Sequence, residues 1–331
     1  MGWCGSDMKK KTALYITRCD IGWYSKNANA YRKPLEVASK YDATLCVDET
    51  CRVPQEIAEK CKEIIRFKGL WGLFRGDFLT QRRRDAEVFT GFDFPCMFKA
   101  WRLKKKFGCR WTVFLWDPPS LSHRDRFPPL RWAIDAVFRF FVRRCDRLVL
   151  NIHPGLLDEI GYKPREEQLE LRMQDAWDSV KCKMENVKLE SASCEHDFGV
   201  LANWEYGKGG PLMAEAMKRM TDKKCLWIGN PPSGDVCGQI VFVGRKPQDE
   251  AFELLKRCRV LVVPYLATHA FKWNYPLKLF EYLQIGRPIL ASDNPGNSAV
   301  AERYSGRIAL FKSGNVDDLV LKAMKMSEES K

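Results

Sequence analysis

The chain contains no long hydrophobic run among its 331 residues. A helix that crosses a bilayer needs roughly 20 consecutive apolar residues. The longest apolar candidate, Trp132 to Val142, is shorter and contains Asp135 and Arg139. The N-terminus also lacks the apolar core of a secretory signal. These absences predict a cytoplasmic protein without a membrane-spanning helix.

Metal-binding and phosphate-binding motifs are also missing. The 13 cysteines form no Cys-x-x-Cys pair, and the four histidines lie far apart in the sequence, so a zinc site is not expected. An odd number of cysteines without a regular spacing favours reduced thiols. No Walker A sequence is present. These observations argue against a zinc-binding domain, a disulfide-stabilised scaffold and a P-loop NTPase.

Acidic residues are outnumbered by basic ones, and the formal net charge is +13. Local basic clusters occur at 82–84, 104–106 and 143–144. Such an excess suggests an anionic partner, which is a nucleic acid, an acidic lipid or a phosphorylated substrate. The predicted helix at 130–144 interleaves arginines with aromatic residues, which favours an anionic membrane surface. Since no nucleic-acid-binding motif is recognisable, we predict peripheral attachment to the cytosolic face of a membrane and no nucleic-acid partner.

Strands and helices alternate twice along the chain. Short apolar runs predict buried parallel strands, with amphipathic helices between them. The polar segment 164–195 interrupts this alternation, which starts again at residue 196. The predicted strands are 13–17, 43–47, 86–90, 111–115, 147–151, 198–202, 225–228, 239–243, 260–263, 289–291 and 307–311, and the main predicted helices are 30–40, 95–107, 130–144, 211–220, 248–258 and 316–326. The pattern predicts an α/β protein with a Rossmann-like domain at 1–163, a connection at 164–195, a second Rossmann-like domain at 196–315 and a C-terminal helix at 316–331.

The most specific signal lies between Asn274 and Asp293. Lys278 and Glu281 are three residues apart on one face of a predicted helix. The helix is expected to end at Gly286, before a short buried strand. A helix with polar side chains in its first turns, followed by a parallel strand, is one way in which an α/β domain forms a ligand site. A surface ion pair between Lys278 and Glu281 is the alternative interpretation.

This segment resembles the nucleotide-sugar motif of GT-B glycosyltransferases, specifically the retaining family 4 (glycosyl transferases group 1). Members often read Pro-Leu-Lys-Leu-x-Glu-Tyr, and residues 276–282 match that pattern. The resemblance implies a GT-B fold, in which two Rossmann-like domains with parallel sheets face each other across a cleft. It also implies that Glu281 accepts hydrogen bonds from the ribose hydroxyls of a nucleoside diphosphate sugar, with Lys278 and Asn274 as further donor-binding residues.

A glycine-rich loop at 203–210 follows a predicted strand and precedes a predicted helix. Its glycines, among them Gly207 and Gly209, allow backbone N–H groups to approach a phosphate. Lys208 adds a positive charge there. The loop resembles the Gly-Arg-(x)-Lys-Gly element of the family, whose basic residues bind the diphosphate. Lys208 matches that element, whereas Asn203 stands where the family has arginine.

A second loop, at Gly244 and Arg245, ends another strand of the same predicted sheet. In the family this loop holds the nucleobase, largely through backbone groups. Arg245 either replaces the missing diphosphate-binding arginine or lies on a solvated basic loop. Both interpretations remain open from the sequence.

The first half of the chain matches the family only weakly. Gly22 occupies the first loop, where a glycine allows the backbone to approach the diphosphate and the acceptor. Asp117 ends a predicted strand and is expected to orient the sugar or an acceptor hydroxyl, with a loop cap as the alternative. One departure is Trp273, which stands eight positions before Glu281, where many relatives carry a second acidic residue. Some branches of the family with an Asn-x-Pro-Leu-Lys pattern also lack that acid, so the resemblance still implies activity. It leaves open the identity of the sugar and the retention of its configuration.

Together these features predict a glycosyltransferase that moves a sugar from a nucleoside diphosphate sugar to a glycan, a lipid-linked acceptor or another hydroxyl. The predicted catalytic residues are Lys208, Asp117 and Arg245. Because the chain contains no Asp-x-Asp sequence, the metal motif of the other glycosyltransferase fold, neither a metal ion nor a cofactor is expected. The alternatives are a sugar-nucleotide epimerase of the same fold and a non-catalytic basic protein that binds membrane or nucleic acid.

Overall fold

A computed structural model describes residues 11–23, 29–76, 86–91, 93–116, 130–172, 194–234, 236–268 and 271–330. These residues form two compact units. The first contains the described residues up to Asn151 together with Leu157–Arg172, and the second contains Ile152–Leu156 and the described residues from Cys194 onward. Within these ranges, no helix combines the length and the apolar character needed to cross a bilayer.

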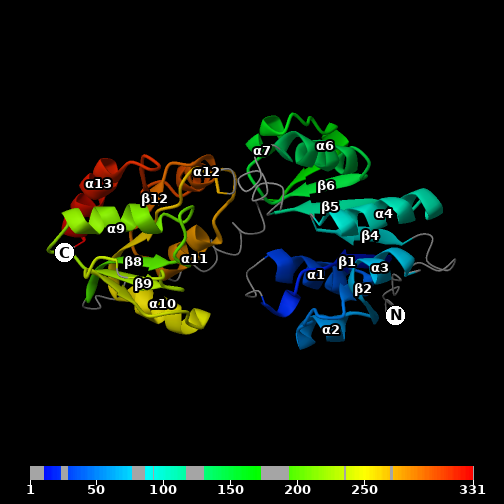
Figure 1. The fold of residues 1–331 in the computed structure, drawn as a ribbon, viewed down its shortest axis with the longest axis horizontal. Helices are drawn as coiled ribbons and strands as arrows, with labels where there is room; N and C mark the ends of the chain where they lie inside the picture. Colours follow the sequence, from blue (N-terminus) through cyan, green and yellow to red (C-terminus); the bar gives the residue numbers. More distant parts are fainter. Residues whose placement is uncertain are drawn as a thin grey trace, which may run out of the picture. The chain divides into compact units, whose positions relative to one another are not determined.

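The first unit is built on a seven-stranded parallel sheet with the order β3-β2-β1-β4-β5-β6-β7 (Figure 1). Its strands are β1 (Thr12–Thr17), β2 (Asp42–Asp48), β3 (Glu63–Phe67), β4 (Glu87–Thr90), β5 (Trp111–Leu115), β6 (Arg147–Leu150) and β7 (Leu169–Leu171). Its helices are α1 (Asn29–Lys40), α2 (Gln55–Lys60), α3 (Gly69–Arg75), α4 (Phe94–Phe107) and α6 (Arg131–Val142), with 3-10 turns η1 (Ile21–Trp23) and η4 (Glu166–Gln168); α7 (Gly155–Glu159) begins in the second unit.

The core of the first unit explains why its central strands are almost wholly apolar. Every residue of β5 is buried, as expected for a parallel strand with both faces covered. The Phe114 ring lies 5.8 Å from that of Phe89 and 6.3 Å from that of Tyr15. This aromatic stack therefore links three neighbouring strands.

The second unit contains a six-stranded parallel sheet with the order β10-β9-β8-β11-β12-β13. The strands are β8 (His196–Leu201), β9 (Cys225–Ile228), β10 (Ile240–Phe242), β11 (Cys258–Val263), β12 (Ile289–Ser292) and β13 (Ile308–Phe311). The helices are α9 (Gly210–Arg219), α10 (Gln248–Lys256), α11 (Leu277–Ile285), α12 (Pro295–Arg303) and α13 (Val316–Glu329). Helices α9 and α13 pack side by side, and α10 contacts α11 (Figure 1). The two parallel sheets with their helices confirm the predicted α/β fold.

The structure divides the chain differently from the predicted boundaries. Strand β7 lies in the segment predicted to be a connection, and it pairs with β6 of the first unit. Helix α13, predicted as a separate C-terminal segment, is part of the second unit. An ion pair of 2.5 Å joins Asp317 of α13 to Arg219 of α9, and Ser327 donates a hydrogen bond of 3.1 Å to Asp197. Strand β7 thus extends the sheet of the first unit, and α13 packs as part of the second unit.

A carboxylate on α1 connects that helix to the segment after β7. Glu36 pairs with Lys33 at 3.2 Å, with Lys40 at 3.0 Å and with Arg172. Burial alone would raise the pKa of Glu36, but these cations outweigh burial and lower its pKa to about 2. The ionised carboxylate therefore stabilises the first unit.

We expect Glu36→Gln to destabilise the first unit by about 1–3 kcal/mol at neutral pH. Because the folded-state pKa is depressed, this stabilisation is complete above about 4.5 and is lost as the pH falls toward about 2. Urea denaturation of the wild type and the variant should therefore converge at low pH. The exposed Glu49→Gln is the matched control, and a Glu36→Gln deficit that persists unchanged near pH 2 would contradict this assignment.

Candidate functional site

The site is centred on the point where the strand order of the second sheet reverses. From the adjacent strands β8 and β11, the chain proceeds outward in opposite directions, through β9 to β10 and through β12 to β13. In open α/β sheets, ligands bind outside the carboxyl ends of the strands at such a switch point. The loops that follow β8 and β11 therefore form the candidate ligand site.

These two loops pack main chain against main chain. Gly209 has a φ of +76°, and a Cβ at that position would lie only 1.9 Å from the carbonyl oxygen of Pro264. Leu266 donates a backbone hydrogen bond of 2.9 Å to Gly207. A Cβ at Gly207 would lie 2.5 Å from the ring of Phe271. Both predicted glycines are thus required for loop closure at the switch point.

Helix α9 begins at this contact, immediately after Gly209. No side chain caps its first turn, but the Gly210 N–H donates to the Glu205 carbonyl at 3.2 Å and Pro211 lacks an N–H group. The partial positive charge at the start of a helix favours an anion. The helix dipole therefore favours a phosphate at this end of α9, although the Gly210 N–H is already used.

Lys208 stands beside that helix end and is already paired. Its ammonium lies 2.9 Å from the carboxylate of Glu205, three residues earlier. The same turn is closed by a 3.2 Å bond from the Lys208 N–H to the Glu205 carbonyl. Sequence reasoning overlooked Glu205. Since an ammonium has three donors, Lys208 retains capacity for a phosphate while it is held by Glu205.

The loops after β8, β9 and β10 are also joined. Arg245 donates through Nε to Oδ1 of Asn203 at 3.4 Å, and the Asn230 N–H donates to the same oxygen at 3.4 Å. Gly229 donates a 2.9 Å backbone bond to Gly244. The structure therefore places Arg245 beside Asn203, the residue that stands where the resembling family has arginine.

Glu281 of α11 is buried, with 4% of the residue exposed, and both its oxygens have partners. Lys278 donates to Oε2 at 2.8 Å, so the ion pair considered as an alternative is present. Gln248, the first residue of α10, lies 3.5 Å from Oε1. Gln248 connects α10, which follows the Arg245 loop, to Glu281.

Tyr265 is close enough to both carboxylates of the site for their charges to act on its hydroxyl. Burial raises the pKa of the Tyr265 hydroxyl, and the negative charges of Glu281 and Glu205 raise it further. Tyr265 also packs its ring 5.3 Å from that of Phe271. Tyr265 therefore stays neutral and forms a wall of the site. Its position at the end of β11 was the available sequence signal, because residues at strand ends face such sites.

Buried polar atoms without hydrogen-bond partners lie just before α11. Among the described residues, neither Oδ1 of Asn274 nor the hydroxyl of Tyr275 has a partner. A Cβ at Gly296 would lie 2.0 Å from the Asn274 carbonyl oxygen, so α12 packs closely on this segment. Unpaired buried polar groups are costly, and both of these atoms are shielded from solvent. The ligand-binding role of Asn274 stays a prediction.

Trp273 occupies the position where the resembling family often has a second acid. Its ring stacks on His153 at 5.3 Å, and its carbonyl accepts a 2.9 Å bond from the His153 N–H. The close fit leaves no room for a Cβ at Gly155, which would lie 2.2 Å from the Trp273 ring. Burial lowers the pKa of His153. An aromatic stack and a neutral imidazole therefore replace a carboxylate here.

The candidate residues of the first unit form a separate set. Gly22 packs against Arg52, since its added Cβ would lie 2.7 Å from the Arg52 Cβ, and its N–H donates to the Arg52 carbonyl at 2.9 Å. Asp20 binds the Arg52 guanidinium at 2.9 Å. These contacts explain Gly22 through local packing. Asp117 lies outside the described residues. In the described part of the chain, no group of three or more His, Cys, Asp or Glu side chains is arranged to hold a metal ion.

Comparison with solved structures identifies the fold class. The chain is similar to sucrose-phosphate synthase from Thermosynechococcus elongatus, with a TM-score of 0.66, 13% identity and coverage of 97% of this chain and 90% of that one. It is also similar to an α,α-trehalose-phosphate synthase (UDP-forming) from Burkholderia xenovorans in complex with glucose-6-phosphate, with a TM-score of 0.56, 14% identity and coverage of 96% and 92%. These likenesses confirm the predicted GT-B fold.

Comparison of sequences relates the second unit to a known family. Residues 195–329 match the model of the family described as glycosyl transferases group 1. The chain is also similar to TuaH of Bacillus subtilis (strain 168), a glycosyltransferase named for teichuronic acid biosynthesis. The identity is 26% over an alignment of 101 residues, and the match covers 28% of this chain. The match spans only 25% of the length of that relative. Residues 276–282 lie inside the matched range, so the predicted resemblance to glycosyl transferases group 1 is confirmed for this part of the chain. Both matches support the prediction of a glycosyltransferase.

We expect Gly209→Ala to destabilise the second unit by about 2 kcal/mol or more, because it combines a strained φ with a clash against the Pro264 carbonyl. Gly244→Ala is a matched control, since Gly244 has a similar φ of +72° but no atom within 4 Å of the added Cβ. It should cost only the backbone strain, about 1–2 kcal/mol. Urea denaturation measures both. Equal losses would show that the contact with Pro264 is unimportant.

Proposed function

We propose that this protein transfers a sugar from a nucleoside diphosphate sugar to a hydroxyl-bearing acceptor without a required metal ion. The observation that carries this proposal is the switch-point site of the second unit. There a buried carboxylate, Glu281, lies on one helix, and Lys208 stands at the start of another, which no side chain caps. A carboxylate for ribose hydroxyls and a cationic helix end for phosphates are the two features that a nucleoside diphosphate requires.

In this proposal Glu281 binds the ribose. An ionised carboxylate has about four lone-pair positions, and Lys278 and Gln248 use one on each oxygen. The remaining positions accept the two vicinal hydroxyls. Lys278 supplies a counter-charge to the buried carboxylate and fixes its rotamer, which supports a positioning role for this lysine.

Lys208 and Arg245 are proposed to stabilise the departing diphosphate. In the reaction, the bond between the sugar carbon and the phosphate oxygen breaks, and a bond from that carbon to the acceptor oxygen forms. The acceptor hydroxyl gives its proton to the departing diphosphate or to solvent. Negative charge grows on the leaving phosphate, so cations and helix N–H groups aimed there lower the barrier. The contact between Arg245 and Asn203 supports Arg245 as the second cation.

The acceptor is proposed to be a phosphorylated sugar, a glycan or a lipid-linked glycan. The Burkholderia relative is a UDP-forming synthase in complex with glucose-6-phosphate, and the Bacillus relative is named for teichuronic acid biosynthesis. Both names favour a sugar-derived acceptor. Gly22 and Asp117 remain the proposed acceptor-side residues, and retention of configuration remains part of the proposal.

Replacement of Glu281 by glutamine tests the donor assignment. We expect Glu281→Gln to weaken the binding of the preferred nucleoside diphosphate by about 1.5–3 kcal/mol, because charge-assisted hydrogen bonds become neutral ones. Titration calorimetry against uridine, guanosine and adenosine diphosphates gives the affinity and the base preference. The exposed Glu302→Gln is the control. Unchanged affinity would reject the assignment, and a collapse of the melting temperature would indicate a purely structural ion pair.

Removal of the cations tests the catalytic assignment. We expect Lys208→Ala to reduce turnover by about 10²-fold and nucleoside diphosphate affinity much less, since the charge on the leaving group grows in the transition state. Steady-state kinetics with a panel of nucleotide sugars and sugar-phosphate acceptors separates the two effects. Glu205→Gln is the informative partner, because it frees Lys208 and should tighten diphosphate binding.

Full turnover in Lys208→Ala would transfer this role to Arg245, and Arg245→Ala should then show the loss. If neither variant changes turnover, the proposed catalytic role of this site is wrong. Isomerised nucleotide sugar without transfer would favour the epimerase instead. Absence of any nucleotide binding by the wild type would favour a non-catalytic protein.

A further inference from the structure

Three neighbouring helices of the first unit share a continuous row of aromatic rings. The Phe74 ring of α3 lies 5.5 Å from that of Phe98 on α4, and Phe98 lies 5.6 Å from Trp101 on the same helix. Trp101 then lies 5.3 Å from Phe140 of α6. All four side chains are at least partly exposed to solvent. The row therefore runs along the outside of α3, α4 and α6.

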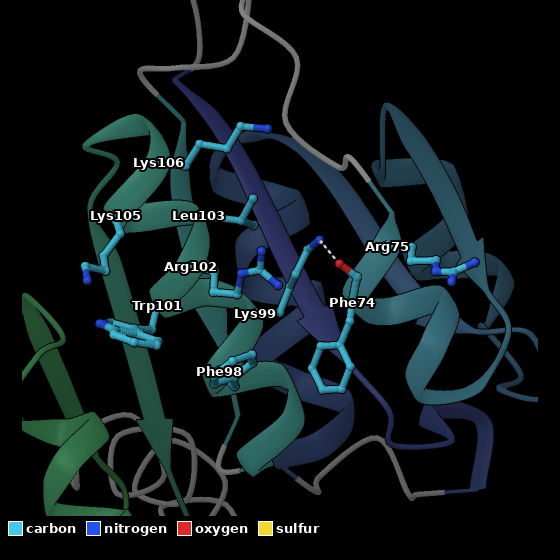
Figure 2. Close-up of a pocket in the computed structure, with 9 residues that line it drawn as sticks. All are labelled: Phe74, Arg75, Phe98, Lys99, Trp101, Arg102, Leu103, Lys105 and Lys106. Carbon is cyan, nitrogen blue, oxygen red and sulfur yellow. Dashed lines mark hydrogen bonds between the residues drawn. The ribbon is translucent and has the colours of Figure 1, made fainter.

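A groove of about 620 Å³ lies between α3 and α4, along this row (Figure 2). Phe74, Phe98, Trp101 and Leu103 supply its apolar lining, and every titratable residue in the lining is a lysine or an arginine. Asp135 is the one acidic residue in the sequences of α3, α4 and α6, and it is buried. The surface of these helices is therefore uniformly positive.

Some of the cations have structural roles. Lys99 reaches across to α3, where it donates to the carbonyls of Phe74 and Gly76 and so fixes the groove (Figure 2). Lys104 binds Asp146 at 2.6 Å, and Arg139 donates to the Ile160 carbonyl at 2.7 Å. Lys104 and Arg139 therefore contribute less to the outer surface than the sequence clusters suggest. The cluster at 82–84 lies outside the described residues.

Other cations are exposed and lie over the aromatic rings. Arg75 lies 5.2 Å from the Trp71 ring centre, and Lys105 lies 5.1 Å from that of Trp101. Arg144 lies 3.7 Å from the Phe140 ring centre. Such pairs keep the rings and the charges on one surface. Arg102 and Lys106 add further exposed charge beside them.

Apolar side chains project from the same helices into solvent. Trp71 is 75% exposed and Leu70 is 45% exposed, both on α3. Such side chains gain free energy when they enter the boundary between headgroups and acyl chains, and nearby cations gain from anionic headgroups. A nucleic-acid backbone would satisfy the cations but would offer Leu70 no apolar environment. The combination favours a lipid surface.

We propose that this surface, the α3–α4–α6 face formed by Leu70, Trp71, Arg75, Trp101, Arg102, Lys105, Lys106 and Phe140, docks on a bilayer that contains anionic phospholipid. The cations bind the headgroup phosphates, and Leu70 and Trp71 enter the interface. Lipid docking through this face requires no nucleotide. It can therefore be tested independently of the proposed sugar transfer.

The test measures binding of the full chain to vesicles without nucleotide. Vesicles of equal parts phosphatidylcholine and phosphatidylglycerol are compared with pure phosphatidylcholine by co-sedimentation at two salt concentrations. The charge variant carries Arg75→Gln, Arg102→Gln, Lys105→Gln and Lys106→Gln. Its control carries Lys218→Gln, Lys224→Gln, Arg307→Gln and Lys325→Gln, which remove the same charge from exposed sites of the second unit. We expect the charge variant to lose about tenfold or more in partition coefficient and the control to lose little.

A second variant tests the apolar contribution. Leu70→Ser with Trp71→Ser should reduce the part of the binding that survives high salt, because burial of apolar surface is not screened. Its control is Leu321→Ser with Met324→Ser, two exposed apolar residues of α13. Calorimetric melting shows that each variant is folded.

Equal losses in the charge variant and its control would overturn the proposal, since binding would then follow net charge alone. It would also be overturned if the wild type failed to bind anionic vesicles while retaining oligonucleotides at the same salt concentration. Binding that is equal for both vesicle types, and unaffected by Leu70→Ser with Trp71→Ser, would reject this face as the docking surface.

Discussion

The second unit depends on the close approach of main chain to main chain at the switch point of its sheet. Gly209 meets the Pro264 carbonyl, and Gly229 meets the Ala202 carbonyl, at separations that leave no space for a side chain. These contacts bring the loops after β8, β9 and β11 together. The start of α9, the turn with Glu205 and Lys208, and the wall formed by Tyr265 and Phe271 all follow from that closure. A site assembled in this way is rigid because backbone atoms, rather than long side chains, set its shape.

The sequence predicted the central strands well because burial on both faces leaves an unmistakable apolar run. The predicted strand 111–115 coincides with β5, and 225–228 coincides with β9. Strand β3 was missed because it lies at the sheet edge and is largely exposed, so its sequence Glu-Ile-Ile-Arg-Phe carries polar residues. Helix α12 was missed for a different reason. Its first turn contains Pro295 and Gly296, and this pair of residues is typical of a loop.

The candidate site was only partly predictable. Lys278 and Glu281 were found because both lie on one helix, where spacing fixes which side chains meet. Gln248 and Tyr265 were not found, because they approach Glu281 from a helix start and a strand end that are distant in sequence. Glu205 was not found although it is three residues from Lys208, because the pair lies in a turn rather than on a predicted helix. For the arginine missing at residue 203, the sequence left open whether Arg245 replaces it. In the structure Arg245 lies beside Asn203 after β10, which is consistent with that replacement.

Internal pairing of charges has a consequence for the selectivity of the proposed donor site. Glu281 is matched by Lys278, and Glu205 by Lys208. Cations without a counter-charge would repel one another and attract any passing anion. Here each of these two cations has a counter-charge within the protein, so an anion that uses the remaining donors of Lys208 shares that cation with Glu205. Under the proposed function, inorganic phosphate and sulfate meet only this shared charge, because they lack a ribose to engage Glu281. The proposed site therefore favours a ligand that binds at both ends over the simple anions of the cell.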